Sequence, residues 1–70
     1  MDMINVNSSN IKAIGYDQES EILTIEFISR HIYKYYGVPK HEFDSLLSAD
    51  SKGKYAHHNI YPNYKQQKIR

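Results

Sequence analysis

One five-residue stretch, LTIEF, constrains the fold of this chain more than any other. Leu23, Ile25 and Phe27 alternate with Thr24 and Glu26, and successive side chains of a strand point to opposite faces of a sheet. The pattern therefore predicts a β-strand that buries one face and leaves the other face polar. A second layer of structure has to cover the apolar face.

Two further strands are predicted beside this one. Residues 10–16 are mostly apolar and predict a strand with a bend or bulge near Gly15. The polar residues 17–20 have the length of a hairpin loop, so this strand should pair antiparallel with residues 23–27. Residues 31–36 predict the third strand of a meander. The Ser-Arg pair before it does not favour the positive φ of a two-residue turn, so a type I-based turn or a longer loop is expected there.

Residues 39–49 are expected to form a short helix. Pro39 suits the first turn, because it lacks the N–H that a first turn leaves unpaired. An apolar stripe at spacing i, i+3 and i+4 should pack on the sheet, and it consists of Phe43, Leu46 and Leu47. Glu42 and Asp44 are expected to face solvent.

A second short helix is expected to begin after Asp50-Ser51, a pair that offers an N-cap, and to end before Pro62. Its inner face would consist of Tyr55, Ala56, Asn59 and Ile60. Residues 1–9 are expected to form an N-terminal arm and residues 63–70 a basic C-terminal tail. The predicted class is α+β: a three-stranded antiparallel β-meander, then one or two short helices packed on one face, with a short C-terminal strand as an option. Residues 1–70 are expected to form a single domain.

Composition excludes several classes of protein. A chain of 70 residues without cysteine must hold one small core together without disulfides, which favours a cytoplasmic protein. Four histidines without a spaced Cys/His set predict no structural metal, and no cofactor is expected. The chain has no apolar run of about 20 residues and no N-terminal secretion signal, so no membrane association is expected.

Catalytic motifs are missing as well. The sequence contains no HExxH, no Gly-rich phosphate loop and no nucleophile elbow. The adjacent His57 and His58 would diverge by about 100° on a helix, which argues against a shared substrate or metal. No catalytic residues are predicted, and the chain is not expected to be an enzyme.

The charges are distributed unevenly along the chain. Residues 1–50 hold eight acidic and four basic side chains, a net charge of −4, whereas residues 51–70 hold five basic and no acidic ones, a net charge of +5. A basic end on an acidic domain favours a polyanionic partner, because Lys and Arg neutralise phosphates in nucleic-acid binding. A basic tail that serves only solubility is the open alternative.

Three tyrosines in four positions mark the third predicted strand. Tyr33 and Tyr35 share one face of it, and we expect them to point inward, with their rings against Phe27 and Phe43. The motif could also serve as a ligand surface, since tyrosine packs like phenylalanine and still forms hydrogen bonds.

Lys34 and Tyr36 would then lie on the outer face beside Thr24 and Glu26. A lysine next to an exposed ring is the combination with which proteins bind single-stranded nucleic acid. Glu26 on the same face would repel phosphate.

A second basic and aromatic segment follows the first helix. If the second helix begins after Ser51, its first N–H groups together with Lys52 and Lys54 would attract an anion. The alternative is an ordinary N-cap with solvated lysines and Tyr55 in the core.

Six short segments, taken in order, resemble the KTSC domain: residues 6–9, 14–17, 23–27, 33–35, 37–39 and 49–55. The resemblance covers nearly the whole chain. KTSC domains occur at the C-terminus of some lysyl-tRNA synthetases and as free-standing small proteins, and they carry a central Tyr-x-Tyr motif. The resemblance implies motif or core positions at Tyr16, Phe27, Tyr33, Tyr35, Gly37, Pro39 and Tyr55. Through the synthetases it also favours RNA binding.

These observations predict a small non-catalytic binding module for tRNA or another structured RNA. The residues expected to contact RNA are Lys34, Tyr36, Lys52, Lys54, His57, Tyr64, Lys65, Lys68 and Arg70. Two alternatives stay open: a protein-interaction module or small regulator or inhibitor of a nucleic-acid enzyme, and an appendage that only adds stability.

Overall fold

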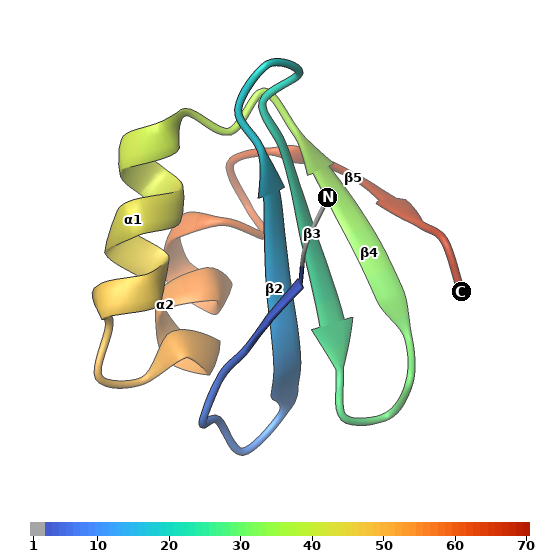
Figure 1. Cartoon of the computed structure of the whole chain (residues 1–70), viewed down its shortest axis with the longest axis vertical. Helices are drawn as coiled ribbons and strands as arrows, with labels where there is room; N and C mark the ends of the chain where they lie inside the picture. Colours follow the sequence, from blue (N-terminus) through green and yellow to red (C-terminus); the bar gives the residue numbers. More distant parts are fainter. Residues whose placement is uncertain (1–2) are drawn as a thin grey trace.

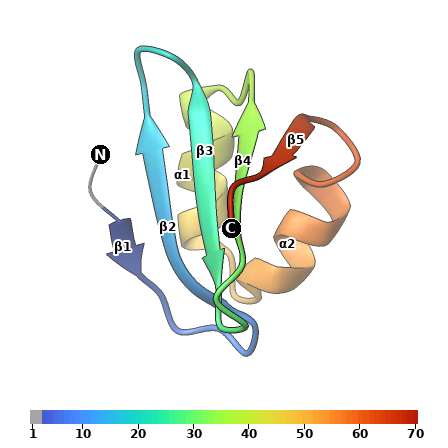
Figure 2. The ribbon, with the colours of Figure 1, turned by 90° about the vertical axis from the view of Figure 1, so that its right-hand side faces the viewer.

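A computed structural model of the chain describes residues 3–70 and contains one antiparallel sheet backed by two helices (Figure 1). The strands follow one another across the sheet in chain order: β1 (Met3–Asn5), β2 (Ile11–Asp17), β3 (Ile22–Phe27), β4 (Ile32–Tyr36) and β5 (Lys65–Lys68). Helices α1 (Lys40–Ser48) and α2 (Lys52–Asn59) lie together on one side of the sheet, and they are behind it in Figure 2. The α+β class is confirmed.

The sheet has two more strands than the predicted three-stranded meander. Strand β5 lies in the basic tail, where a short C-terminal strand was predicted as an option, and it pairs with β4. Strand β1 falls in the segment expected to be an N-terminal arm, and it pairs with β2. Residues 1 and 2 of that arm lie outside the described residues. All three β1 side chains are exposed. The strand therefore has no buried face that an alternation of apolar and polar residues could have indicated in the sequence.

The irregularity in β2 is not at the predicted position. Gly15 sits in regular register opposite Thr24, and the register shift falls between Ile11 and Ala13. In an unbroken strand Lys12 would share the inner face with Ile14. The bulge instead leaves the Lys12 side chain 60% exposed while Ile11 is fully buried.

The core lies between the helices and the inner face of the sheet. Leu23 is paired with Tyr35, and Ile25 with Tyr33, so the two motif tyrosines share the face of these buried residues as expected. The helices contribute the buried side chains of Leu46, Ala56 and Ile60.

The aromatic contacts correct one expected pairing. Phe27 meets Tyr33 edge to face with ring centroids 5.8 Å apart, but Phe43 does not join this pair. It stacks on Tyr16 at 4.8 Å instead, because Tyr16 continues the inner face of β2 to where α1 begins. Phe43 and Tyr16 thereby tie α1 to β2.

The turns before and after β4 each contain one residue with a left-handed backbone conformation. Between β3 and β4 the chain forms a loop longer than two residues, in which Arg30 has a φ of 77° and donates its N–H to the Phe27 carbonyl at 2.9 Å. After β4, Gly37 has a φ of 74°, a conformation that glycine adopts without the steric cost of a Cβ. These two turns set the direction in which β4 enters and leaves the sheet.

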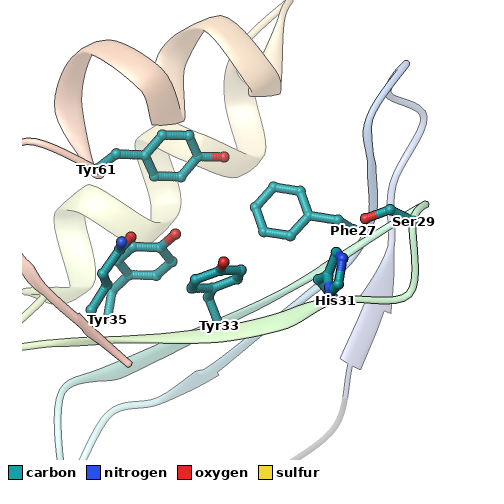
Figure 3. A pocket seen from close by; sticks show the side chains of 7 residues that line it. Phe27, Ser29, His31, Tyr33, Tyr35 and Tyr61 are labelled. Atoms are coloured by element: carbon teal, nitrogen blue, oxygen red, sulfur yellow. The ribbon is translucent and has the colours of Figure 1, made fainter. Parts of the chain in front are cut away.

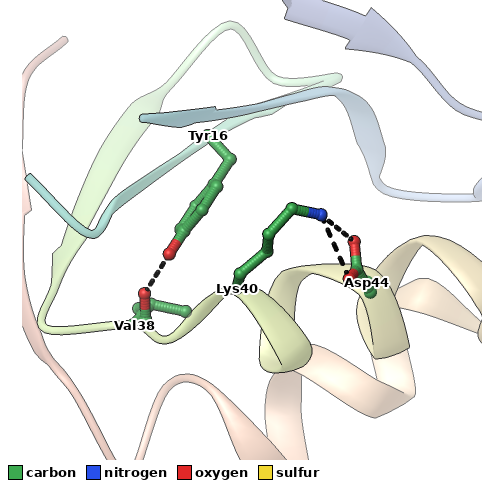
Figure 4. A network of polar contacts seen from close by, with 4 residues as sticks. All are labelled: Tyr16, Val38, Lys40 and Asp44. Carbon is green, nitrogen blue, oxygen red and sulfur yellow. Dashed lines mark hydrogen bonds and ion pairs between the residues drawn. The ribbon is translucent and has the colours of Figure 1, made fainter. Parts of the chain in front are cut away.

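Helix α1 begins one residue later than expected. Pro39 is its N-cap residue and not its first helical residue. The preceding carbonyl, that of Val38, accepts a hydrogen bond of 2.6 Å from the Tyr16 hydroxyl, and Lys40 and Asp44 form an ion pair of 3.2 Å along the helix (Figure 4). Tyr16 thus fixes the start of α1 by a ring contact and by a hydrogen bond.

Helix α2 begins as expected, with Ser51 as its N-cap. The Ser51 hydroxyl accepts a hydrogen bond from the backbone N–H of Lys54 at 3.3 Å. Gly53 permits a close approach of the loop before β2, since a Cβ at this position would lie 2.6 Å from the Asn10 side-chain oxygen. The first turn of α2 therefore rests against that loop.

Glu42 does not face solvent as its helical position predicted, whereas Asp44 does. The Glu42 carboxylate accepts hydrogen bonds from the hydroxyls of Tyr55 and Tyr64, the second at 3.1 Å. Tyr55 belongs to α2, and Tyr64 precedes β5. One carboxylate therefore joins α1, α2 and the segment leading to the last strand.

Candidate functional site

The face of the sheet turned away from the helices is covered by no other helix or strand of residues 3–70 (Figure 2). On this open face Lys34 lies opposite Gln67, and Tyr36 lies opposite Lys65. The Tyr36 hydroxyl donates to the side-chain oxygen of Gln67, which holds the ring in one orientation. Two lysines and one oriented aromatic ring thus share one part of the open face.

Glu26 also lies on this face, where repulsion of phosphate was expected. Its carboxylate is 3.9 Å from the Lys12 ammonium. The bulge in β2 brings Lys12 to this position, so the negative charge has a positive neighbour. Asp17, the last residue of β2, is a second acidic residue on this face, since it lies opposite Ile22 and Ile22 lies opposite Tyr36. The open face therefore carries two acidic strand residues, and the carboxylate of Glu26 has Lys12 beside it.

Five of the other residues expected to bind RNA are not on this face. Lys68 lies on the helix side of strand β5, opposite Tyr33, and the remaining four belong to α2 or to the segment after it. Arg70 is exposed and follows β5. Lys52 donates to the carbonyl of Ala49 at 3.1 Å and so satisfies the end of α1. Lys54 and His57 are exposed on α2. Tyr64 is partly buried, with its hydroxyl on Glu42. The structure thus divides the predicted residues between the two layers.

The two adjacent histidines come closer than their helical spacing indicated. The ring centroids of His57 and His58 are 5.3 Å apart, with the rings nearly perpendicular. Within residues 3–70, however, no three side chains of the metal-binding types form a group that could hold an ion. The histidine pair alone provides too few ligands for a metal site.

A small polar pocket of about 200 Å³ lies where the loop before β2 meets the start of α2. Its lining consists of Asn7, Ser8, Ser9, Asp50, Ser51 and Lys52. The Lys52 ammonium is engaged by a backbone carbonyl, and Asp50 adds a negative charge. The lining therefore carries one positive and one negative charge, and the anion site expected here stays a prediction.

A larger cleft of about 390 Å³ opens on the helix side of the sheet, between β4 and the turn after α2 (Figure 3). Phe27, Ser29, His31, Tyr33, Tyr35, Tyr61 and Gln66 line it, and we call it the aromatic cleft. The sequence pattern placed three of its rings on one face but did not predict the cleft, because Tyr61 comes from a turn 26 residues beyond Tyr35.

The rings of the aromatic cleft contact one another around the open space. Tyr61 stacks on Tyr35 with centroids 5.6 Å apart and lies 6.3 Å from Phe27. Figure 3 shows the Tyr61 hydroxyl pointing toward Phe27 while Tyr33 and Tyr35 rise from β4 below it. The Tyr61 hydroxyl oxygen is buried and has no hydrogen-bond partner. A buried hydroxyl without a partner is costly, and Tyr61 is one of the residues that line the cleft.

Burial also changes the acidity of these phenols. It raises the pKa of Tyr35 above its ordinary value of 10.0, with further contributions from the neighbouring Tyr61 and Tyr33. Burial likewise raises the pKa of Tyr61. Both groups therefore keep their protons in the folded protein at a pH where the unfolded chain has lost them.

This difference predicts that the protein loses stability in alkali. Because the folded-state pKa of Tyr35 is raised, its contribution is complete below about pH 9 and is lost as the pH rises above 10, by about 1.4 kcal/mol per pH unit. Urea denaturation between about pH 8 and pH 11 measures the effect. The variant Tyr35→Phe should show a shallower decline, and an equal decline in both proteins would contradict the assignment.

Comparison with known proteins gives a consistent match. The model of the KTSC domain family matches residues 7–64. A protein from Tsukamurella paurometabola is 40% identical over 60 residues, which cover 86% of this chain and 90% of that protein. The crystal structure of a KTSC domain protein from Yersinia pestis has a TM-score of 0.95 at 35% identity and covers 99% of this chain and 97% of that one.

A longer relative contains the same segment. A lysine–tRNA ligase from a Nostoc species is 36% identical over 67 residues, or 96% of this chain, but these make up only 12% of the ligase. In residues 3–70 no helix is long and apolar enough to cross a membrane.

Proposed function

Since the chain belongs to the KTSC domain family and is similar to a segment of lysine–tRNA ligases, we propose that it is a non-catalytic module that binds tRNA or another structured RNA. The proposed contact surface is the open face of the sheet near strand β5. A cytoplasmic location, expected from the lack of cysteine, belongs to the same proposal.

The observation that carries the proposal is the register of β4 with β5. It places Lys34, Tyr36 and Lys65 on one uncovered face, where the lysines can meet phosphates and the ring can stack on a base. Stacking on an aromatic side chain is worth about 1–3 kcal/mol per base. The hydrogen bond from Tyr36 to Gln67 orients the ring before RNA arrives, so less conformational entropy is lost on binding.

The relatives support an RNA as the ligand. The Nostoc protein is by its name a ligase that acts on tRNA, and it carries this segment within a longer chain. A segment that is found both alone and attached to such a ligase fits an accessory contact better than a catalytic centre. The charges fit as well, since strand β5 and the two residues after it contain Lys65, Lys68 and Arg70 and no acid.

A matched pair of variants tests this location. Replacing Lys34 and Lys65 by glutamine should weaken binding of labelled bulk tRNA about tenfold and reduce the slope of log K against log salt by about 1.4–1.8, because two phosphate contacts are lost. Fluorescence anisotropy at several salt concentrations measures both quantities.

The control replaces Lys40 and Lys54 by glutamine, which removes the same charge from the helix layer. It should bind tRNA nearly as well as the parent protein. If the control loses as much affinity as the open-face variant, tRNA is attracted by the net positive charge of the protein and not by one face, and the proposed surface is wrong. If the parent protein fails to bind tRNA at low salt, the proposed function itself is wrong.

A further inference from the structure

We propose that the aromatic cleft is a binding site for a single nucleotide, with the base against the rings of Tyr33 and Tyr61 and the phosphate at the mouth beside strand β5. The inference rests on the proposed function only for the choice of ligand class. The cleft opens on the face of the sheet opposite the proposed RNA contact, and Gln66 and Lys68 of strand β5 lie on its side.

The shape and lining of the cleft fit a flat, polar ring. Its volume of about 390 Å³ lies within the range of small-molecule pockets. Tyr33 and Tyr61 offer ring surface to a base, while Tyr35 is only 2% exposed and packs between them. The Gln66 amide supplies both a donor and an acceptor at the border of the cleft.

The unpartnered hydroxyl of Tyr61 is the strongest single indication of a ligand. Its oxygen is buried and forms no hydrogen bond within the chain. Most buried polar atoms have a partner, and those without one need an explanation. A base edge in the cleft would supply that partner after a small rotation of the Tyr61 ring that exposes the hydroxyl.

The charges around the cleft favour an anionic ligand over a cation. Aromatic rings attract cations through the negative potential of their faces, and positive charge nearby weakens this attraction. No acidic residue lines the cleft that could strengthen it. Lys68 lies opposite Tyr33 in the sheet, on the same side as the cleft, and His31 is part of the lining. A phosphate at the mouth would meet these two residues.

Strand β5 connects the cleft with the open face of the sheet. Its side chains alternate, so Lys65 and Gln67 lie on the open face while Gln66 and Lys68 lie on the cleft side. Because β5 is an edge strand, a single strand of RNA that crosses this edge would contact both faces. The nucleotide in the cleft could thus be a free monophosphate or an unpaired nucleotide of an RNA.

The test is an NMR titration of the ¹⁵N-labelled full chain with 5′-AMP, adenosine and ribose 5-phosphate. We expect 5′-AMP to shift the amide signals of Tyr33, Tyr61 and Gln66 and to saturate at millimolar concentration. Adenosine should bind several-fold more weakly, because it lacks the phosphate, and ribose 5-phosphate should leave these signals unmoved. Trimethyl-lysine is the competing probe, and saturable shifts with it but not with 5′-AMP would overturn the inference.

Two variants make the test specific. Tyr61→Phe removes only the unpartnered hydroxyl and should weaken 5′-AMP binding about tenfold without lowering thermal stability. Lys68→Gln should weaken 5′-AMP binding several-fold but leave adenosine binding unchanged, whereas its control Lys54→Gln should change neither. Equal 5′-AMP affinity in the parent protein and in Tyr61→Phe would overturn the assignment of the base position.

The tRNA titration separates this inference from the proposed function. Loss of tRNA affinity in Tyr61→Phe would support an unpaired RNA nucleotide as the occupant of the cleft. Binding of 5′-AMP by a protein that fails to bind tRNA would support a free nucleotide and reject the proposed function. Binding of tRNA without any effect of 5′-AMP on the cleft signals would reject the cleft site alone.

Discussion

Replacing Tyr35 by alanine is expected to lower the free energy of unfolding by about 3–5 kcal/mol. Tyr35 is the largest of the fully buried side chains and is only 2% exposed. Its ring packs between Tyr33 and Tyr61 on the inner face of the sheet, so alanine would leave a cavity lined by rigid rings. A core of this size supplies only about 3–5 kcal/mol in total, so the variant should be largely unfolded at 25 °C. Urea denaturation followed by circular dichroism measures the loss.

Two further variants show whether the effect of Tyr35 comes from the ring or from its hydroxyl. Tyr35→Phe keeps the ring and should stay within about 1 kcal/mol of the parent protein. Tyr33→Ala removes the other motif tyrosine, which is only partly buried, and should cost clearly less than Tyr35→Ala. If Tyr35→Ala unfolds at the same urea concentration as the parent protein, the packing described for this residue is incorrect.

Replacing Glu42 by alanine is expected to destabilise the protein by about 2 kcal/mol. The change removes two charge-assisted hydrogen bonds, from the hydroxyls of Tyr55 and Tyr64. Such bonds contribute about 1.5–3 kcal/mol each when buried, but all three residues are partly exposed, so a smaller total is expected. The hydrogen bond from its hydroxyl to the Glu42 carboxylate also raises the pKa of Tyr55. Thermal and urea denaturation of the variant measure the change.

A double-mutant cycle separates the bond to Tyr55 from the general loss of a side chain. If Glu42 and Tyr55 interact directly, Glu42→Ala combined with Tyr55→Phe should cost less than the sum of the two single changes. Glu42→Gln keeps one oxygen acceptor and should retain part of the stability. Additive costs in the cycle would mean that the hydrogen bond contributes nothing measurable.

Much of the fold follows from short stretches of sequence. The alternation around Ile25 predicted both the strand and its inner face, and the spacing of Phe43, Leu46 and Leu47 predicted the first helix. Ser51 predicted the start of the second helix, which the structure confirms. These signals work because strand and helix periodicity depend only on residues within a few positions of one another.

The candidate surfaces followed from the sequence only in part. Alternation along β4 placed Lys34 and Tyr36 on the face opposite Tyr33 and Tyr35. It could not show that Lys65 would join them, because this depends on the register between two strands almost 30 residues apart. The aromatic cleft needs the same kind of information, since Tyr61 reaches it from the turn after α2.

The sequence by itself thus determined the class of the domain, three of its strands, the first helix and the inward direction of the tyrosine pair. Only the tertiary structure decided the pairing of β1, the bulge at Lys12, the role of Glu42 and the division of the basic residues between two faces. The physical reason is that local periodicity fixes which side of an element is apolar, whereas contacts between distant elements depend on how the whole chain fills one small core.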